Sequence, residues 1–197
     1  MSSPPAPSVP DLGERGWTLD EEREEVRFEL PTMRVLAHTL VFSDAALRAR
    51  VREATALDPT WRFFVATRLG FEPPLPPLTG NASVYGSVRS EARDAFVEDL
   101  RDRGVEGIER GRTERLRTET RDRVSLTRYR GTCRLDRESE AVVPVAGALG
   151  VWTHDGDFRL AGGGYPETSL STTLDGAPET DPNAFRDELV VLVRGTR

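Results

Sequence analysis

The chain has 197 residues, 37% of them hydrophobic and 30% charged, with a formal net charge of −6. This length and composition predict a globular protein of one domain, and no apolar run approaches the ~20 residues that a membrane-spanning helix needs. All 27 basic residues are arginine, which excludes lysine Schiff-base chemistry and the phosphate-binding loop that depends on a lysine.

The N-terminal segment is rich in proline. Four prolines among the first ten residues predict a disordered tail over residues 1–15 and a single domain over residues 16–197. The segment has neither the basic start nor the apolar core of a secretory signal. Together with a single cysteine, this predicts a cytoplasmic protein.

Strands come first in the domain. Residues 26–30 alternate in polarity, and residues 33–42 are apolar on both faces, which predicts a central strand covered on both sides. Ser43 or Asp44 can cap a helix that runs to about residue 57.

Residues 61–71 form the clearest strand, since alternate positions are large and apolar. The sequence PPLPP at residues 73–77 matches a ligand for groove-binding domains, but we predict a stiff connector between strand and helix, which is an ordinary connection within a domain. We predict the longest helix from a cap at Ser87 to Gly104.

The second half of the chain is dominated by strands. Residues 105–135 indicate a long hairpin, and residues 142–165 a second hairpin with a tight Asp155-Gly156 turn. Asp181 caps the last helix, and Pro182 occupies its first helical position. This order predicts an α+β fold with one mainly antiparallel sheet of about six to eight strands and three helices packed on it.

The run FRLAGGGYPE contains Gly162, Gly163 and Gly164. Three glycines can cradle a phosphate, but that requires a helix N-terminus directly after them, and a loop follows instead. The other interpretation is that a neighbouring backbone or helix packs closely against the glycines. We expect this structural role and keep the ligand cradle as the alternative.

The two histidines give a poor metal signal. His38 lies in an apolar strand, where a hydrogen-bonded core residue is the usual role, and His154 precedes a turn. No His/Cys spacing typical of a metal site occurs, so we expect no metal and no cofactor. No GxSxG motif is present, and Cys133, although flanked by Arg130 and Arg134, is expected to be structural.

Charge is distributed unevenly. Residues 101–137 contain 12 arginines and 7 acidic residues, against a net charge of −6 for the chain. A basic hairpin could dock on nucleic acid, but the acids are interleaved and only Tyr129 could stack on a base. We therefore predict cross-strand ion pairs and expect weak, non-specific nucleic-acid binding at most.

Three segments, WRFFVATRLGFEPPLPP, FRLAGGGYPE and AFRDELVVLVR, together resemble an uncharacterised protein family of halophilic archaea. The resemblance spans most of the chain after the N-terminal tail, and it implies no known activity and no site residues. An acidic, lysine-free composition is typical of such organisms. The order of elements also resembles the Mog1/PsbP-like α+β domains, which implies binding of a partner rather than catalysis.

Two classes of function stay open. The first is a non-enzymatic binding or interaction module for a protein or small-molecule partner. The second is a small-molecule-binding protein or enzyme whose pocket lies between sheet and helices, near His38, Tyr165 and the glycines around Gly163. A filled sheet–helix interface would favour the first class, and an apolar cavity with polar groups around it would favour the second.

Overall fold

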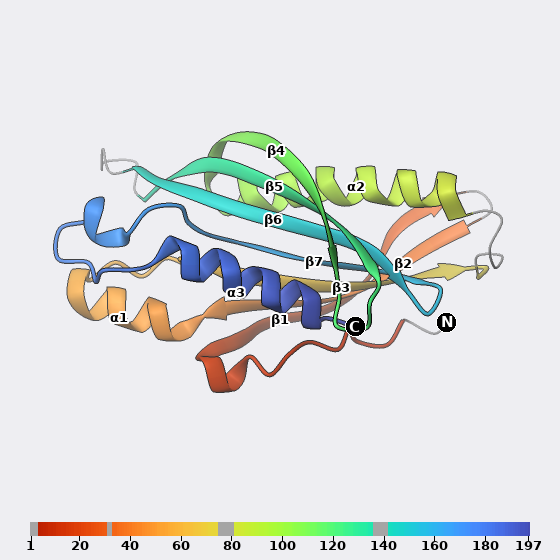
Figure 1. The fold of residues 1–197 in the computed structure, drawn as a ribbon, viewed down its shortest axis with the longest axis horizontal. Helices are drawn as coiled ribbons and strands as arrows, with labels where there is room; N and C mark the ends of the chain where they lie inside the picture. Colours follow the sequence, from red (N-terminus) through yellow and green to blue (C-terminus); the bar gives the residue numbers. More distant parts are fainter. Residues whose placement is uncertain (1–3, 31–32, 75–80, 136–141) are drawn as a thin grey trace.

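A computed structural model describes residues 4–30, 33–74, 81–135 and 142–197 and shows one antiparallel sheet with three α-helices (Figure 1). The seven strands are β1 (Trp17–Leu30), β2 (Met33–Asp44), β3 (Phe63–Glu72), β4 (Val105–Arg117), β5 (Arg123–Arg134), β6 (Val142–His154) and β7 (Asp157–Pro166). The helices are α1 (Ala45–Thr55), α2 (Asn81–Asp102) and α3 (Pro182–Gly195), with two short 3-10 turns, η1 (Gly13–Arg15) and η2 (Leu170–Thr172). The predicted α+β fold with a single antiparallel sheet is confirmed.

The strand order β1-β2-β3-β7-β6-β5-β4 brings the two halves of the chain together at the centre of the sheet. Strands β1 to β3 form one consecutive group and β4 to β7 form another. The central pair β3 and β7 joins the groups in a register that runs from Phe63 opposite Gly164 to Leu69 opposite Phe158. The middle of the sheet thus depends on contacts between residues far apart in the sequence.

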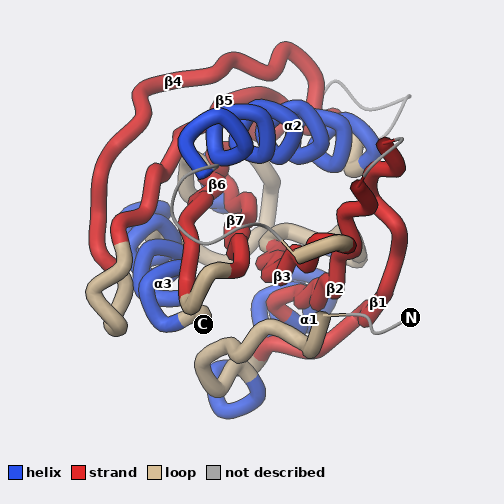
Figure 2. The backbone as a smooth tube through the Cα atoms, turned by 90° about the vertical axis from the view of Figure 1, so that its right-hand side faces the viewer, coloured by secondary structure: helices blue, strands red, loops and turns tan. Residues whose placement is uncertain are grey.

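Helices cover both faces of the sheet, α2 on one face and α1 with α3 on the other (Figure 2). Successive strand residues point to opposite faces, so neighbouring residues enter different cores. Phe63 packs in the core under α2, whereas Phe64 packs in the core with α1 and α3. The apolar character of both faces, predicted for residues 33–42, follows from this double covering.

Helices α1 and α3 each begin at an aspartate cap, which comes just before the regularly spaced apolar residues of the helix. Asp44 accepts a hydrogen bond from the backbone N–H of Leu47 at 2.8 Å, and Asp181 accepts one from the backbone N–H of Asn183 at 2.9 Å. The predicted cap of α3 and its proline at the first helical position are confirmed, and of the two predicted caps for α1 the structure uses Asp44.

Helix α2 begins earlier than the predicted cap at Ser87. The additional turns continue through Gly86, a residue that disfavours a helix. Tertiary contacts account for them, since the Tyr85 hydroxyl donates to the Val151 carbonyl at 2.9 Å and its ring lies 5.7 Å from that of Phe158. Most of the proline-rich connector predicted at residues 73–77 lies outside the described residues.

The N-terminal segment lies against the domain along the described part, residues 4–15, although its composition predicted a disordered tail. Pro4 is buried, and its carbonyl oxygen lies 3.0 Å from Nδ1 of His38. Ser8 and Arg197 exchange two backbone hydrogen bonds of 2.9 and 2.8 Å. Leu12 is 3% exposed in the core with α1 and α3. Contacts with the C-terminus, which local composition does not encode, hold this segment.

Candidate functional site

A cavity of about 240 Å³ lies between the C-terminal end of α2 and one end of the sheet. Leu100 of α2 and Val105 of β4 line one side, and residues of β3, β5, β6 and β7 line the rest. The loop before β3 adds Trp61 at the edge. Most of these residues are aliphatic, aromatic or glycine, so the wall is predominantly apolar.

The floor of the cavity is a row of residues in register across four strands. Phe63 of β3 pairs with Gly164 of β7. Gly164 pairs with Gly147 of β6, which in turn pairs with Tyr129 of β5. A Cβ atom on Gly164 would lie 2.6 Å from the Phe63 ring, and one on Gly147 would lie 2.9 Å from the Gly163 carbonyl oxygen. The Phe63 ring fills the space above Gly164, and Phe96 of α2 lies 3.8 Å from the Cβ position of Gly147, so the two glycines make room for neighbouring aromatic rings.

Aromatic rings fix the sides of this row. Phe96 of α2 has its ring centroid 6.3 Å from that of Phe63 and 5.2 Å from that of Tyr129. All three residues are buried, with Tyr129 only 1% exposed. Tilted ring pairs at such distances add to the stability that burial alone provides. Phe63 and Tyr129, which line the cavity, are therefore packed against Phe96 behind them.

Arg103 lies at the rim of the cavity, just beyond the end of α2. Its guanidinium carbon is 4.0 Å from the centroid of the Phe63 ring, a cation–π arrangement. Asp99, one helical turn earlier, interacts with Arg103 electrostatically, but within the described ranges no carboxylate oxygen lies within 4.0 Å of the guanidinium. Asp20 and Glu21 of β1 also attract this charge, so Arg103 has carboxylates nearby but no direct ion pair among the described residues.

Two further hydrogen-bond donors belong to cavity residues. The indole nitrogen of Trp61 and the hydroxyl of Tyr129 are buried and have no hydrogen-bond partner among the described residues. Burial raises the pKa of the Tyr129 hydroxyl to about 12, although nearby arginines lower it somewhat. The phenol is therefore neutral at physiological pH and able to donate.

Cys133 lines the same cavity and is half-buried. Burial, with a smaller contribution from the charge of Glu106, raises the pKa of its thiol above 9.0. The flanking arginines do not activate it, because alternate residues of a strand point to opposite faces. The thiol is protonated at neutral pH, which agrees with the expectation that Cys133 is not a nucleophile.

The structure separates the residues that the sequence grouped as a pocket. Tyr165 and Gly164 line the cavity, whereas Gly163 does not. A Cβ on Gly163 would lie closer than 3.0 Å to the carbonyl oxygen of Phe63 and 3.2 Å from Leu189 of α3. The close approach that we expected for the glycine run is confirmed, and the run lies within central strand β7, not at the start of a helix.

His38 lies at another part of the sheet. It pairs in register with Arg68, five positions along β3 from Phe63, which corresponds to about 17 Å. Its Nε2 lies 2.8 Å from a carboxylate oxygen of Glu22, and its Nδ1 faces the Pro4 carbonyl. The expected role as a hydrogen-bonded core residue is confirmed, and His38 does not line the cavity.

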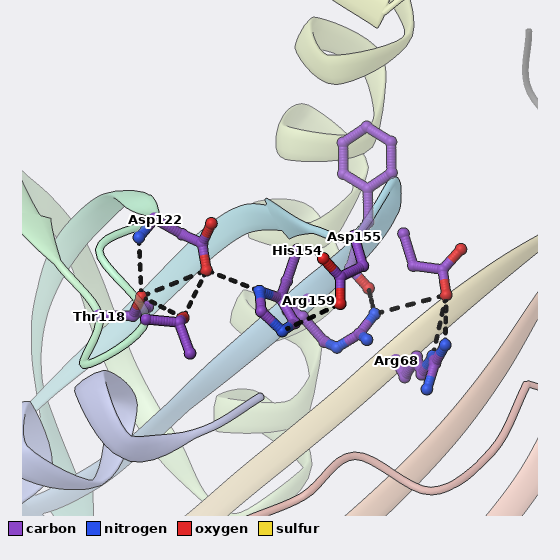
Figure 3. A network of polar contacts seen from close by, with 9 residues as sticks. Arg68, Thr118, Asp122, His154, Asp155 and Arg159 are labelled. Atoms are coloured by element: carbon purple, nitrogen blue, oxygen red, sulfur yellow. Dashed lines mark hydrogen bonds and ion pairs between the residues drawn. The ribbon is translucent and has the colours of Figure 1, made fainter. Parts of the chain in front are cut away.

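His154 belongs to a polar network that joins two hairpin turns (Figure 3). Its Nδ1 lies 2.8 Å from Oδ2 of Asp122, in the β4–β5 turn, and Asp155 forms the tight β6–β7 turn with a positive φ of 50°. Arg68 of β3 donates to Asp157 at 2.6 Å. Within the described part of the chain, no group of three or more His, Cys, Asp or Glu residues could hold a metal ion.

The basic segment forms the β4–β5 hairpin. Glu114 accepts hydrogen bonds from Arg112 at 2.9 Å and from Arg128 at 3.3 Å, the second across the two strands. Arg130 forms an ion pair of 2.6 Å with Glu167. Among the described residues, the predicted cross-strand ion pairing of the hairpin is observed at Glu114, whereas Glu119 and Asp122 pair with Arg197 and His154 outside it.

Sequence reasoning kept a pocket near Tyr165 and the glycine run as one alternative, but it missed several residues that line the cavity, among them Phe63, Arg103 and Tyr129. A signal was present: Gly147 and Gly164 lie in segments, GALG and GGGY, where strands otherwise carry large side chains. Without the register of β6 and β7, however, the two glycines could not be placed side by side.

Comparison with known proteins gives a family but no activity. The family model described as a domain of unknown function (DUF6517) matches residues 4–197. No curated protein matches the chain. Across the described residues, the helices lack the combination of length and apolar character that crossing a bilayer requires.

Proposed function

The chain belongs to the DUF6517 family, and we propose that this member is a small-molecule-binding protein without catalytic activity, which holds a small, mainly apolar molecule between α2 and the sheet. The observation that carries the proposal is the cavity of about 240 Å³, walled by aromatic and aliphatic side chains over a floor of glycine. Binding sites for small molecules are typically concave and mostly apolar, with a few polar groups that orient the ligand.

The volume limits the size of the ligand. Because an engineered apolar cavity of about 150 Å³ accepts benzene, a cavity of about 240 Å³ suits a molecule of roughly ten non-hydrogen atoms. At about 0.3–0.6 kcal/mol per atom, such a ligand gains roughly 3–6 kcal/mol, a dissociation constant between millimolar and tens of micromolar. The binding experiment must therefore reach millimolar ligand.

The polar groups of the cavity support binding rather than catalysis. Arg103, the Trp61 indole and the Tyr129 phenol are all donors, and the Cys133 thiol is held protonated. General-base catalysis requires an acceptor within hydrogen-bond reach of the substrate. The two histidines do not line the cavity, so they are not placed for that role.

The test uses 1-octanol, a neutral apolar probe with nine non-hydrogen atoms, titrated to millimolar concentration by calorimetry. We expect it to bind to the parent protein and to Cys133→Ala, which keeps the cavity open. We expect Cys133→Phe, which fills the cavity, to lose binding. Each variant is first checked for an unchanged fold by circular dichroism.

If Cys133→Phe fails to fold, Thr60→Trp replaces it, since Thr60 is exposed at the edge of the cavity and tolerates a larger side chain there. Equal binding of octanol to the open and the filled variants would contradict the proposal. The proposal would also be contradicted if the parent bound none of the probes: neither octanol, nor octanoate, nor 4-phenylbutanoate, nor their amides.

We also propose that the protein works in the cytoplasm of a halophilic organism. The absence of lysine and the excess of 33 acidic over 27 basic residues support this origin, because a strongly hydrated carboxylate surface maintains solubility in concentrated salt. A protein that kept its fold and octanol binding at molar potassium chloride would agree with the proposal, and one that precipitated there would not.

A further inference from the structure

We infer that the ligand of the cavity is an apolar molecule with a single negatively charged head, of the carboxylate type, recognised by Arg103. This inference rests on the proposed function and specifies its ligand class. It comes from the charges and hydrogen-bond donors around the cavity.

The charge of the cavity wall is opposite to that of the protein. The described residues that line it include Arg103 and Arg130 and not one Asp or Glu, although the chain has 33 acidic residues and a net charge of −6. A concave site lined by one sign of charge concentrates ligands of the other sign. A cationic ligand would find no carboxylate in this lining, so the wall selects for an anion.

Of these two arginines, only Arg103 is free to bind an anion. Arg130 is 73% exposed and already forms an ion pair of 2.6 Å with Glu167. Arg103 has no such partner within 4.0 Å in the described part of the chain, and its planar guanidinium lies 4.0 Å above the ring of Phe63 at the edge of the apolar wall. A guanidinium matches a carboxylate through two parallel hydrogen bonds. Arg103 can therefore offer both hydrogen bonds to one carboxylate of a ligand.

The rest of the wall suits an apolar body. Leu100, Val105 and Val145 line it beside Phe63. The indole N–H of Trp61 and the hydroxyl of Tyr129 are buried and expose almost no surface to the cavity, so Arg103 is the group that would bind the head of the ligand. The arrangement therefore suits a medium-chain or aromatic carboxylic acid in its ionised form.

The test compares octanoate with octanamide, which have the same shape and differ in charge. Both are titrated at neutral pH into the parent protein, Arg103→Gln, Arg103→Lys and the control Arg101→Gln. Arg101 is exposed in the last turn of α2 and does not line the cavity. A second pair, 4-phenylbutanoate and its amide, tests an aromatic body, and octylamine tests a cationic head.

We expect octanoate to bind about tenfold more tightly than octanamide in the parent and in Arg101→Gln, since a charge-assisted hydrogen bond is worth roughly a factor of ten. The preference should vanish in Arg103→Gln and persist in part in Arg103→Lys. It should shrink in about 1 M salt, where the screening length is near 3 Å.

Equal affinity of the parent for acid and amide would overturn the inference while leaving the proposed function intact, and tighter binding of octylamine would do the same. A preference for octanoate that survives in Arg103→Gln would overturn the assignment to Arg103. Absence of binding by every probe would instead contradict the proposed function.

Discussion

The carbonyl oxygen of Phe63 occupies the space that a side chain on Gly163 would need, closer than 3.0 Å to the position of its Cβ atom. On the other side of that position, Leu189 of α3 lies at 3.2 Å. We expect Gly163→Val to destabilise the protein by about 1–3 kcal/mol or more, since β3 and β7 would have to separate. Denaturant midpoints of the variant and the parent measure the change.

A matched control is Gly86→Ala. Gly86 lies inside α2, and a Cβ atom there would meet nothing within 4 Å. Alanine should be neutral or stabilise the helix by about 0.5–1 kcal/mol. If Gly163→Val were as stable as the parent and nucleotides raised the melting temperature of the parent, the glycine run would be a ligand cradle after all.

A second prediction concerns Arg62, a charge in the core. Arg62 is 5% exposed, donates to Asp44 and Glu188 at 2.6 Å each, and lies between the rings of Trp17 and Phe185. Arg62→Leu preserves apolar bulk but leaves a buried carboxylate unpaired, so we expect a loss of about 3–5 kcal/mol in the free energy of unfolding.

The control for Arg62 is Arg48→Leu. Arg48 binds Asp58 through two hydrogen bonds of 2.7 and 3.0 Å, but both side chains are exposed. Water replaces the lost contacts there, so the denaturant midpoint should hardly move. Similar losses in the two variants would mean that burial does not determine the effect of these ion pairs.

The fold class was predictable because each element has its own local pattern. Alternation identified the strand at residues 61–71, and Asp181 with Pro182 identified the start of α3. The sequence also indicated that the glycine run lies in a strand, since no helix begins directly after it. These signals act over a few residues and need no knowledge of the partner strand.

The sequence offered a pocket beside Tyr165 and the glycine run as an alternative, but the other walls of the cavity were not predictable, because they depend on register between distant segments. Phe63, Gly164, Gly147 and Tyr129 form one row only because β3 pairs with β7 and β5 with β6. The sequence does not reveal that strand order. For the same reason the proline-rich N-terminus was expected to be disordered, whereas Ser8 pairs with the C-terminus of the chain.

A third prediction links pH to the docking of the N-terminal segment on His38. Burial alone would lower the pKa of His38, but hydrogen bonds to Glu22 and to the Pro4 carbonyl, with the charges of Glu24 and Glu22, together raise it above 6.5. Both ring nitrogens face acceptors, so the imidazolium is the form that satisfies both. Arg68, its register neighbour on β3, is neutralised by Asp157.

Because the pKa in the folded state is the higher one, this contribution to stability is full below the unfolded value of 6.5 and is lost as the pH rises through the folded value. The advantage of the parent over His38→Gln in denaturant midpoint should thus be larger at about pH 5.5 than at about pH 9. His154→Gln, which leaves His38 in place, should keep the dependence. A constant advantage across this range would contradict the assignment.

The last prediction uses Cys133 as a reporter of the cavity. Its thiol pKa is raised above 9.0 by burial and by Glu106, and only the thiolate reacts with iodoacetamide. At about pH 7.5 we expect alkylation to be slower than that of a free cysteine, whose pKa is about 8.5. Since Cys133 is the only cysteine and lines the cavity, millimolar octanoate should slow the reaction further.

Mass spectrometry over time gives the alkylation rates with and without octanoate. In the variant Arg103→Gln, protection of the thiol by octanoate should weaken. A rate equal to that of free cysteine, unaffected by octanoate, would show that the thiol is open to solvent and that the acid does not bind beside it.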